Sequence, residues 1–162
     1  MKPSQTCFNL IQSFEGYERK VAGSTDCTAY LCPAKVWTIG FGTTYNHDAK
    51  RAVRQGDRIS RETAERYMRK DIEDFALSLN EEIVKAKCVV TQNQFDALVS
   101  FVYNIGIAAF RSSSVFTELK SGNNALAADR MLRWTKAGKI ELEGLVRRRK
   151  EERALFLRKE SE

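Results

Sequence analysis

The sequence has little of what disordered, fibrous or cross-linked chains are made of. Its 162 residues include only two prolines and nine glycines, whereas collagen-like and low-complexity chains are rich in both. Apolar residues make up 43% and charged residues 30% of the chain, a balance that excludes intrinsic disorder. At this length roughly two-thirds of the unfolded surface can be buried, so folding needs no metal or disulfide. We therefore expect one domain over residues 1–162.

Cysteine and histidine are too few and too irregularly spaced for a typical metal site. The cysteines are Cys7, Cys27, Cys32 and Cys88. They form no CxxC pair, and His47 alone cannot complete a zinc set, so we expect no metal and no other cofactor. The simplest interpretation is four reduced thiols, mostly buried, as in cytosolic proteins. A disulfide between Cys27 and Cys32, formed after export, is the alternative.

Long apolar runs are missing as well. Polar residues interrupt the first twenty positions, which therefore do not resemble a signal peptide. The most apolar stretch, residues 98–110, contains Ser100, Asn104 and Gly106 and is too short to span a bilayer. The sequence favours a soluble protein made in the cytosol, without stable membrane insertion, which another protein must release if it acts outside.

Acidic residues are outnumbered by basic ones. The 27 Lys and Arg against 21 Asp and Glu leave a net charge of +6 and a pI near 9.2. A basic chain favours an anionic partner, which can be nucleic acid, an acidic membrane or an acidic glycan. Acids are interspersed throughout and no nucleic-acid-binding motif is present. We keep a nucleic-acid-binding module only as an alternative.

The first third of the chain contains the one break in a helical pattern. Apolar spacing predicts a helix within residues 7–20, which Gly16 ends. Turn-forming residues then predict a loop over residues 21–35. The β-branched and aromatic residues of 36–42 indicate a short strand or hairpin.

The remaining chain is expected to be helical. Ser60 is a candidate N-cap for a long helix to about Asn80, and residues 91–94 match a capping box. Further helices are expected over residues 112–121, 123–136 and 145–159, with Gly106 as an interruption and Gly122 and Gly138 as stops. The fold class is therefore α+β and mostly helical. Its expected parts are a small N-terminal lobe with a short β-sheet (about 13–60), a connecting helix (about 60–80) and an all-helical C-terminal lobe (about 81–162, plus the N-terminal helix), with a ligand cleft between the lobes.

Glu15 is the candidate proton donor. It lies at a predicted helix end, between Phe14 and Gly16. Apolar surroundings favour a neutral carboxyl group, which can donate a proton near neutral pH. A solvated surface acid is the alternative, since composition alone does not distinguish Glu15 from Glu18.

Four ordered segments, covering nearly the whole chain, resemble phage-type lysozymes, the endolysins of glycoside hydrolase family 24. The first combines FEG at 14–16 with AYLCPAKVWTIGFGTT at 29–44, which is similar to the family's active-site region. The others are TQNQFDALVSFVYNIG at 91–106, RWTKAG at 133–138 and GLVRRR at 144–149. A lone TIGxG would be weak, whereas four segments in order are specific.

The resemblance implies a lysozyme-like fold and hydrolysis of the β-1,4 bond between N-acetylmuramic acid and N-acetylglucosamine in peptidoglycan, with host cell lysis as the outcome. The family site is a Glu, then usually an Asp, then a Thr six residues past that Asp. Glu15 corresponds to the family's Glu and Thr38 to its Thr, but Cys32 stands where the Asp is expected. Thr38 would place the attacking water; a strand Thr without a chemical role is the alternative.

Three interpretations of the absence of an Asp at position 32 remain open. Glycoside hydrolysis normally uses two carboxyl groups. Cys32 can supply the second group as a thiolate, either as a base or as a nucleophile. Asp26 can supply it instead. It lies in a loop over residues 21–28, which makes the interval between Glu15 and Thr38 longer than the corresponding interval in a phage lysozyme. The ungapped register favours Cys32, and a buried thiol without a chemical role is the third reading.

The resemblance also implies binding residues. Asn104 would line the cleft, and Arg147 would be the basic residue nearest Glu15, so both are expected to bind substrate. The other cations of the run 147–150 are expected to form a solvated helix face, paired with Glu151 and Glu152. His47 is expected to be exposed and not catalytic.

Such an endolysin implies peptidoglycan as its substrate, a monomer, and no nucleic acid. It would stay in the host cytoplasm until a separate membrane-permeabilising protein released it to the periplasm or cell wall. Because the Asp is missing, a catalytically weak wall-binding relative is an alternative. Within the enzyme class, a transglycosylase would give an anhydro product.

Overall fold

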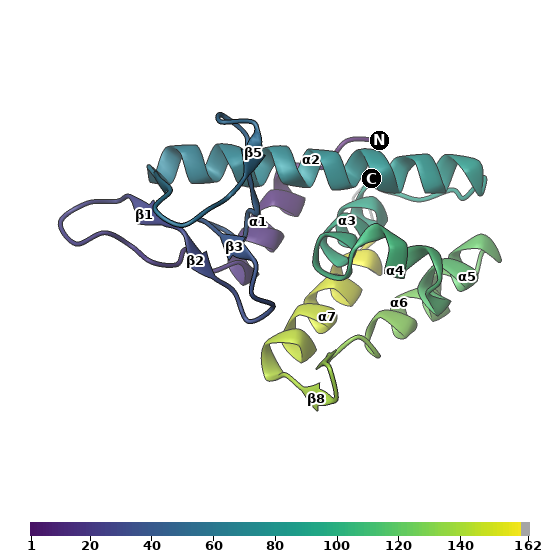
Figure 1. The fold of residues 1–162 in the computed structure, drawn as a ribbon. Helices are drawn as coiled ribbons and strands as arrows, with labels where there is room; N and C mark the ends of the chain where they lie inside the picture. Colours follow the sequence, from purple (N-terminus) through teal and green to yellow (C-terminus); the bar gives the residue numbers. More distant parts are fainter. Residues whose placement is uncertain (160–162) are drawn as a thin grey trace. The chain divides into compact units, whose positions relative to one another are not determined.

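Helices dominate the computed structural model, which describes residues 1–159 (Figure 1). The helices are α1 (Gln5–Phe14), α2 (Arg61–Lys85), α3 (Gln92–Ile105), α4 (Ile107–Arg111), α5 (Ser114–Lys120), α6 (Asn124–Met131) and α7 (Glu143–Phe156). The strands are β1 (Cys27–Thr28), β2 (Tyr30–Leu31), β3 (Trp37–Thr38), β4 (Tyr45–Asn46), β5 (Arg51–Ala52), β6 (Arg58–Ile59), β7 (Lys136–Ala137) and β8 (Ile140–Glu141). The predicted α+β, mostly helical class is confirmed. Within residues 1–159, none of the helices has the length and apolar character needed to cross a membrane.

Internal contacts divide the chain into two units, each described by itself. The strand unit comprises residues 11–71, and the helical unit comprises residues 1–10 with the chain from Ile72 onward. Helix α2 contributes its first part to the strand unit and the rest to the helical unit.

Short antiparallel pairs and one tight turn build the strand unit. The pairs are β1–β6, β2–β3 and β4–β5. The turn is closed by two hydrogen bonds between the backbones of Ile39 and Thr43 (2.8 and 3.1 Å). At Gly40 the backbone has φ +63°, and an added Cβ would lie 2.8 Å from the Cβ of Ala64 on α2. Carbon atoms normally stay about 3.5 Å or more apart, so glycine permits this turn to pack against α2.

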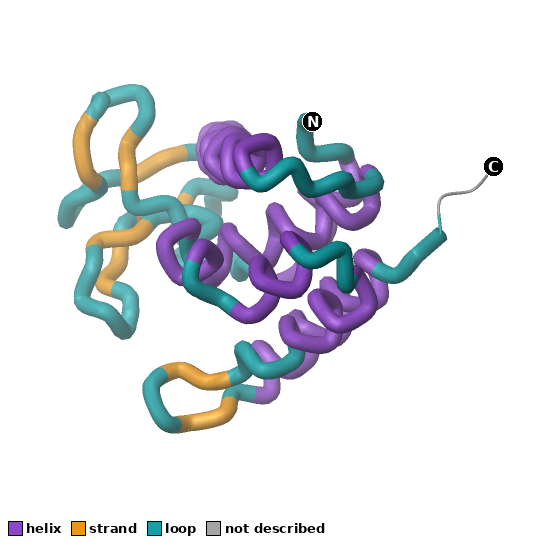
Figure 2. The backbone as a smooth tube through the Cα atoms, turned by 90° about the vertical axis from the view of Figure 1, so that its right-hand side faces the viewer, coloured by secondary structure: helices purple, strands orange, loops and turns teal. Residues whose placement is uncertain are grey.

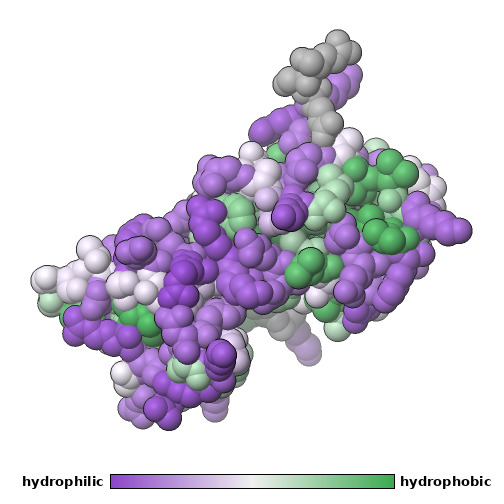
Figure 3. Space-filling view, turned by 90° about the horizontal axis from the view of Figure 1, so that it is seen from above, coloured by the Kyte–Doolittle hydropathy of each residue, from purple (hydrophilic) through white to green (hydrophobic). Residues whose placement is uncertain are grey.

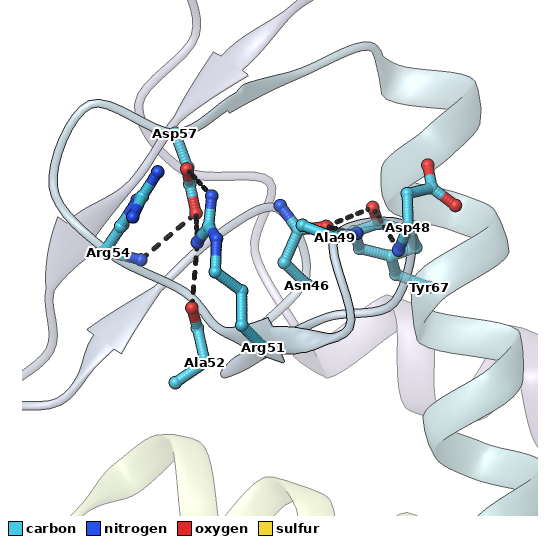
Figure 4. A network of polar contacts seen from close by, with 8 residues as sticks. All are labelled: Asn46, Asp48, Ala49, Arg51, Ala52, Arg54, Asp57 and Tyr67. Atoms are coloured by element: carbon cyan, nitrogen blue, oxygen red, sulfur yellow. Dashed lines mark hydrogen bonds and ion pairs between the residues drawn. The ribbon is translucent and has the colours of Figure 1, made fainter.

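An ion pair links the β4–β5 hairpin of the strand unit to the loop that follows it (Figure 4). The Arg51 guanidinium donates to both carboxylate oxygens of Asp57 at 2.8 Å, and the Arg54 N–H donates to the same carboxylate at 3.1 Å. The Arg51 side chain has the largest effect on the pKa of Asp57 and lowers it; burial opposes this change, and the Arg54 N–H lowers the pKa further, so that it falls from 3.8 to about 2. Beside this pair, the Tyr67 hydroxyl donates to Asn46 Oδ1 at 2.8 Å. The network ties β5 to the loop before β6 and β4 to α2.

Both predicted helix caps are confirmed. Ser60 Oγ accepts the N–H of Thr63 at 3.1 Å at the start of α2. Thr91 and Gln94 form a reciprocal capping box at the start of α3. Gly106 ends α3 with φ +86°, as predicted, and separates it from α4.

Helix α3 is the centre of the helical unit, where α7 packs against it and α5 packs against α6. Its residues from Phe95 to Val102 are all buried. The chain start is attached here too: Ser4 N–H donates to Asp96 Oδ1 at 3.0 Å, the Gln92 side chain donates to the Lys2 carbonyl at 2.9 Å, and the Met1 ammonium donates to Asn80 Oδ1 at 2.8 Å.

Three local predictions were wrong. The expected loop over 21–35 contains β1 and β2, whose two residues each are too few to show strand periodicity. The C-terminal part is not all helical, because the helix expected over 123–136 ends at Met131 and the hairpin β7–β8 follows (Figure 2). Gly138 sits in that hairpin's turn with φ +62°, so it is a hairpin residue rather than a helix stop.

Some of the apolar side chains that are exposed at the surface lie on the C-terminal half of α2 or just after it. Leu77, Val84 and Val89 are exposed by 64%, 66% and 89%. Figure 3 shows a mostly hydrophilic face with apolar atoms gathered at the end where the C-terminal half of α2 lies in Figure 1. This surface belongs to the helical unit.

Candidate active site

A tight hairpin turn brings the segment before Cys32 back alongside Thr38. Pro33 follows Cys32, and its fixed φ suits the first corner of a turn. The Lys35 N–H donates to the Cys32 carbonyl at 2.8 Å, and Lys35 itself has φ +59°. The Cys32 N–H then donates to the Val36 carbonyl at 3.0 Å. A type I-like turn followed by a left-handed residue is a common three-residue hairpin connection.

The hairpin register places Cys32 and Thr38 on one face. Tyr30 pairs with Thr38 and Leu31 with Trp37, so Cys32 pairs with the position before Trp37. Because side chains alternate along strands, Tyr30, Cys32 and Thr38 point to the same side. Cys32 and Thr38 are diagonal neighbours across this face.

Hydrogen-bond donors around the sulfur favour the Cys32 thiolate. The Val36 N–H has the largest effect, and the Ala34 N–H and the Thr38 hydroxyl add to it, so the pKa of Cys32 is lowered although burial opposes the change. Thr38 is itself buried, 4% exposed, and its hydroxyl donates to the Val36 carbonyl at 3.0 Å. Because a hydroxyl has one hydrogen, Thr38 would have to turn away from this carbonyl to donate to the sulfur.

Glu15 lies in the same unit, directly after α1. Its N–H donates to the Ile11 carbonyl at 3.0 Å, which extends the helical turn, and its side chain is half-buried. The carboxylate Oε2 is 3.4 Å from the point where a Cβ at Gly42 would stand. Burial raises the pKa of the Tyr30 hydroxyl, and the charges of Glu18, Cys32 and Glu15 raise it further. Glu15 and Cys32 therefore share Tyr30 as an electrostatic neighbour.

Asp26, the alternative second carboxylate, has another partner. Arg58 Nε donates to Asp26 Oδ2 at 2.8 Å, where β1 and β6 pair. The Asp26 side chain is 28% exposed. To act on a ligand it would have to give up this ion pair.

His47 is not the exposed loop residue that we expected. Its ring is 17% exposed, and Nε2 lies 2.7 Å from Asp71 Oδ1. Thr43 Oγ1 donates to the other oxygen of the same carboxylate at 2.7 Å. The ring also contacts Tyr45 and Tyr67 edge-on, with centroids 5.3 and 5.1 Å away. This cluster joins β4 to α2.

The two predicted binding residues lie in the helical unit. Asn104 is exposed near the end of α3, and Arg147 is exposed on α7. Arg149 Nη2 donates a hydrogen bond to Asn104 Oδ1 at 2.8 Å.

The expected solvated face of residues 147–150 was wrong for two of its cations. Arg148 and Arg149 are 3% and 0% exposed, and both pair with Glu152, which is also fully buried. Burial raises the pKa of Glu152, and the two arginines oppose that effect. Ser100 Oγ donates to Glu152 Oε1 at 2.7 Å from α3.

The sequence contained a signal for this buried group. Ser100 and Asn104 are polar and one helical turn apart, within the otherwise apolar residues 97–105 of α3. Arg148 and Arg149 stand four and three residues before Glu152, the spacing that pairs them on one helix. Matching polar positions on two helices point to a network rather than to a solvated face.

Among residues 1–159, no cluster of three or more His, Cys, Asp or Glu side chains is arranged to hold a metal ion. The chemistry available in the strand unit is thus that of a half-buried carboxyl group, a thiol biased towards its thiolate, and a hydroxyl.

Comparison with known proteins identifies the family. The phage lysozyme family matches residues 13–152. The chain belongs to the phage lysozyme family. The endolysin of Bacillus phage PZA is 42% identical over 156 residues, which cover 96% of this chain and 55% of that protein. The chain therefore spans only about half the length of this phage lysozyme relative.

Solved structures of similar proteins confirm the lysozyme-like fold. An endolysin from Escherichia coli O157:H7 phage FAHEc1 has a TM-score of 0.81 and 36% identity, covering 97% of this chain and 94% of that one. The muramidase domain of SpmX from Asticaccaulis excentricus has a TM-score of 0.81 and 35% identity, covering 98% and 99%. The phage lysozyme fold thus extends over nearly all of this chain.

Proposed function

We propose that this protein is an endolysin, a muramidase that hydrolyses the β-1,4 bond between N-acetylmuramic acid and N-acetylglucosamine in bacterial peptidoglycan. Membership of the phage lysozyme family supports the reaction class. The observation that carries the proposal is the hairpin β2–β3, which holds the Cys32 sulfur among hydrogen-bond donors beside Thr38. Glu15 lies in the same unit.

In the proposed mechanism, Glu15 acts as the general acid and Cys32 as the second catalytic group, in place of an aspartate. Protonated Glu15 gives its hydrogen to the glycosidic oxygen as the bond from that oxygen to the sugar carbon breaks. A water molecule attacks the carbon from the other side and passes a proton to the Cys32 thiolate. Thr38 holds that water through its hydroxyl. Transfer of the proton from the thiol to the Glu15 carboxylate through solvent restores the starting state.

The alternative in which Asp26 is the second group is less well supported, because its carboxylate is bonded to Arg58. Three variants test the assignment: Glu15→Gln, Cys32→Ala and Asp26→Ala, assayed by product release from purified peptidoglycan with reductant present. We expect Glu15→Gln and Cys32→Ala to lose at least a hundredfold in rate, the typical contribution of a positioned acid or base. Asp26→Ala should keep most activity.

A matched thiol control separates the chemistry from general sensitivity to cysteine loss. Cys88 is the other partly exposed cysteine and belongs to the helical unit, so Cys88→Ala should leave the rate within about twofold. Cys32→Asp, which returns a carboxylate, should recover activity over Cys32→Ala. Full activity in Glu15→Gln would refute the muramidase assignment, and an anhydro product in mass spectrometry would replace hydrolysis by transglycosylation.

We also propose that the protein acts as a monomer and reaches the wall only after a separate protein opens the inner membrane. The net charge of +6 favours the anionic envelope once access exists. Expression in bacteria with and without a membrane-permeabilising protein tests this. Lysis without any permeabilising partner would contradict the proposed route.

A further inference from the structure

Tyr30 stands beside the two groups of the hairpin β2–β3 to which the proposed mechanism assigns a role. In the register of this hairpin, Tyr30 is the direct partner of Thr38, and residues paired in this way have Cβ atoms about 4.5–5.5 Å apart. Cys32 follows Tyr30 by two residues, so its side chain points to the same side of the hairpin. The Tyr30 side chain therefore shares one face with Cys32 and Thr38.

The hydroxyl group of Tyr30 is available to a ligand. Tyr30 is half-buried, yet its hydroxyl has no hydrogen-bond partner within residues 1–159. Two other tyrosines of the strand unit do have partners, since Tyr17 donates to the Thr25 carbonyl and Tyr67 donates to Asn46 Oδ1. In the same part of the chain, the unpaired side-chain polar atoms that are sealed from solvent all lie in the helical unit. The oxygen of Tyr30 is therefore in contact with solvent, which a ligand can replace.

The charges around this hydroxyl keep it a hydrogen-bond donor. Burial has the largest effect on the pKa of Tyr30 and raises it. The charges of Glu18, Cys32 and Glu15 raise the pKa further, and the charge of Arg19 acts in the opposite direction. The phenol thus keeps its hydrogen at a pH where the Cys32 thiolate is present. A protonated phenol can donate to an acceptor oxygen, and the acidic groups around it disfavour an acceptor that is itself negatively charged.

We propose that Tyr30 is a further substrate-binding residue of the site, and that its hydroxyl donates a hydrogen bond to a neutral oxygen of the sugar on which Glu15 and Cys32 act. The acceptor is either the acetamido carbonyl or a hydroxyl oxygen of that sugar, since both accept in the same way. The inference rests on the proposed function for the identity of the substrate. A tyrosine side chain has only two rotatable bonds before its ring is fixed, so little conformational entropy is lost on binding.

Tyr30→Phe removes the hydroxyl and keeps the ring. Because the hydroxyl has no partner within residues 1–159, the midpoint of urea unfolding should not change. The loss of one neutral hydrogen bond to the substrate should raise KM about threefold to tenfold, with kcat within about twofold of wild type. A hydroxyl with only a structural role would change the unfolding midpoint and leave KM as it is. An unchanged KM would overturn the proposal.

Tyr45→Phe is the matched control. Tyr45 belongs to the same unit but to the hairpin β4–β5, where its ring contacts His47 edge-on. The control removes a hydroxyl from the strand unit without changing the hairpin β2–β3. Its KM should stay within about twofold of wild type. An equal rise in KM in Tyr30→Phe and Tyr45→Phe would show a general effect and overturn the proposal.

The labelling of Cys32 distinguishes contact with the substrate from support of the thiolate. A Tyr30 hydroxyl that donated to the sulfur would stabilise the thiolate, and its removal would slow the reaction with iodoacetamide at pH 7. If the hydroxyl serves the substrate instead, Cys32 should react in Tyr30→Phe at the wild-type rate. Slower labelling would replace the proposed contact by a positioning role for Cys32.

Binding assays in the Glu15→Gln background separate this contact from hydrolysis. On purified soluble glycan, addition of Tyr30→Phe should weaken binding about threefold to tenfold. A loss that disappears on de-N-acetylated glycan assigns the acetamido carbonyl as the acceptor, and a loss that persists there assigns a sugar hydroxyl. Equal binding with and without Tyr30→Phe on both glycans would refute the contact. Wild-type protein that binds glycan but does not hydrolyse it would reject the proposed function, whereas the binding loss would still test the role of Tyr30.

Discussion

Replacement of Gly40 by alanine should destabilise the strand unit for two separable reasons. The backbone there has φ +63°, which costs an L-residue roughly 1–2 kcal/mol. The new Cβ would also lie 2.8 Å from the Ala64 Cβ, and overpacking of this kind costs about 1–3 kcal/mol. We expect Gly40→Ala to lower the free energy of unfolding by about 2–5 kcal/mol.

Gly23→Ala isolates the backbone contribution. Gly23 has a similar φ of +70° but no atom within 4 Å of an added Cβ, so it should cost only about 1–2 kcal/mol. Urea unfolding followed by circular dichroism measures all variants. Ala64→Gly, which costs about 1 kcal/mol alone, should become neutral or stabilising in the Gly40→Ala background, because it removes the crowded methyl group. Strict additivity of the two substitutions would refute the crowding argument.

Two further predictions concern the stability of the fold at low pH and the rate at which an alkylating reagent labels Cys32. Because Arg51 holds the pKa of Asp57 down from 3.8 to about 2, the charged carboxylate stabilises the fold above pH 4, and this stability is lost as the pH falls towards 2. Allowing for solvent screening of this partly exposed pair, Asp57→Asn should cost about 1–2 kcal/mol at pH 7 in urea unfolding, and about half of that difference should be gone at pH 3. Equal differences at both pH values would contradict the ion-pair explanation. At pH 7, iodoacetamide should label Cys32 in the native protein much faster than the buried Cys27, as followed by peptide mass spectrometry. Thr38→Val should slow labelling of Cys32 at pH 7 but not at pH 10, where the thiolate forms without help; slowing at both would indicate altered access instead.

Local chemistry made much of the fold predictable. Ser60 and Thr91 were identifiable as caps because a side-chain oxygen next to unpaired N–H groups satisfies them whatever the tertiary structure. Gly106 was identifiable as a helix end for a similarly local reason. Gly138 shows the limit, since the same left-handed backbone serves a helix stop and a hairpin turn. Only the pairing of residues 136–141 decides between them.

In the candidate site, the residue types were predictable from the sequence, but the surroundings of each residue were not. Its residue types followed from the resemblance to phage lysozymes, whereas the environment of each residue depends on the folded backbone. The lowered pKa of Cys32 arises from N–H groups that converge only in the finished turn. The burial of Arg149 arises from α3 residues that lie far away in sequence. His47 looked solvated because its partner, Asp71, is supplied by another element.

The attachment of the first residues to α3 has a consequence for synthesis on the ribosome. Ser4 bonds to Asp96, 92 positions later, so the beginning of the chain emerges long before its partner exists. Residues 11–71 form one uninterrupted segment, and their contacts can mature during translation, since compact portions of a nascent chain tend to fold as they emerge. Residues 1–10 therefore cannot make this attachment until residue 96 has been synthesised.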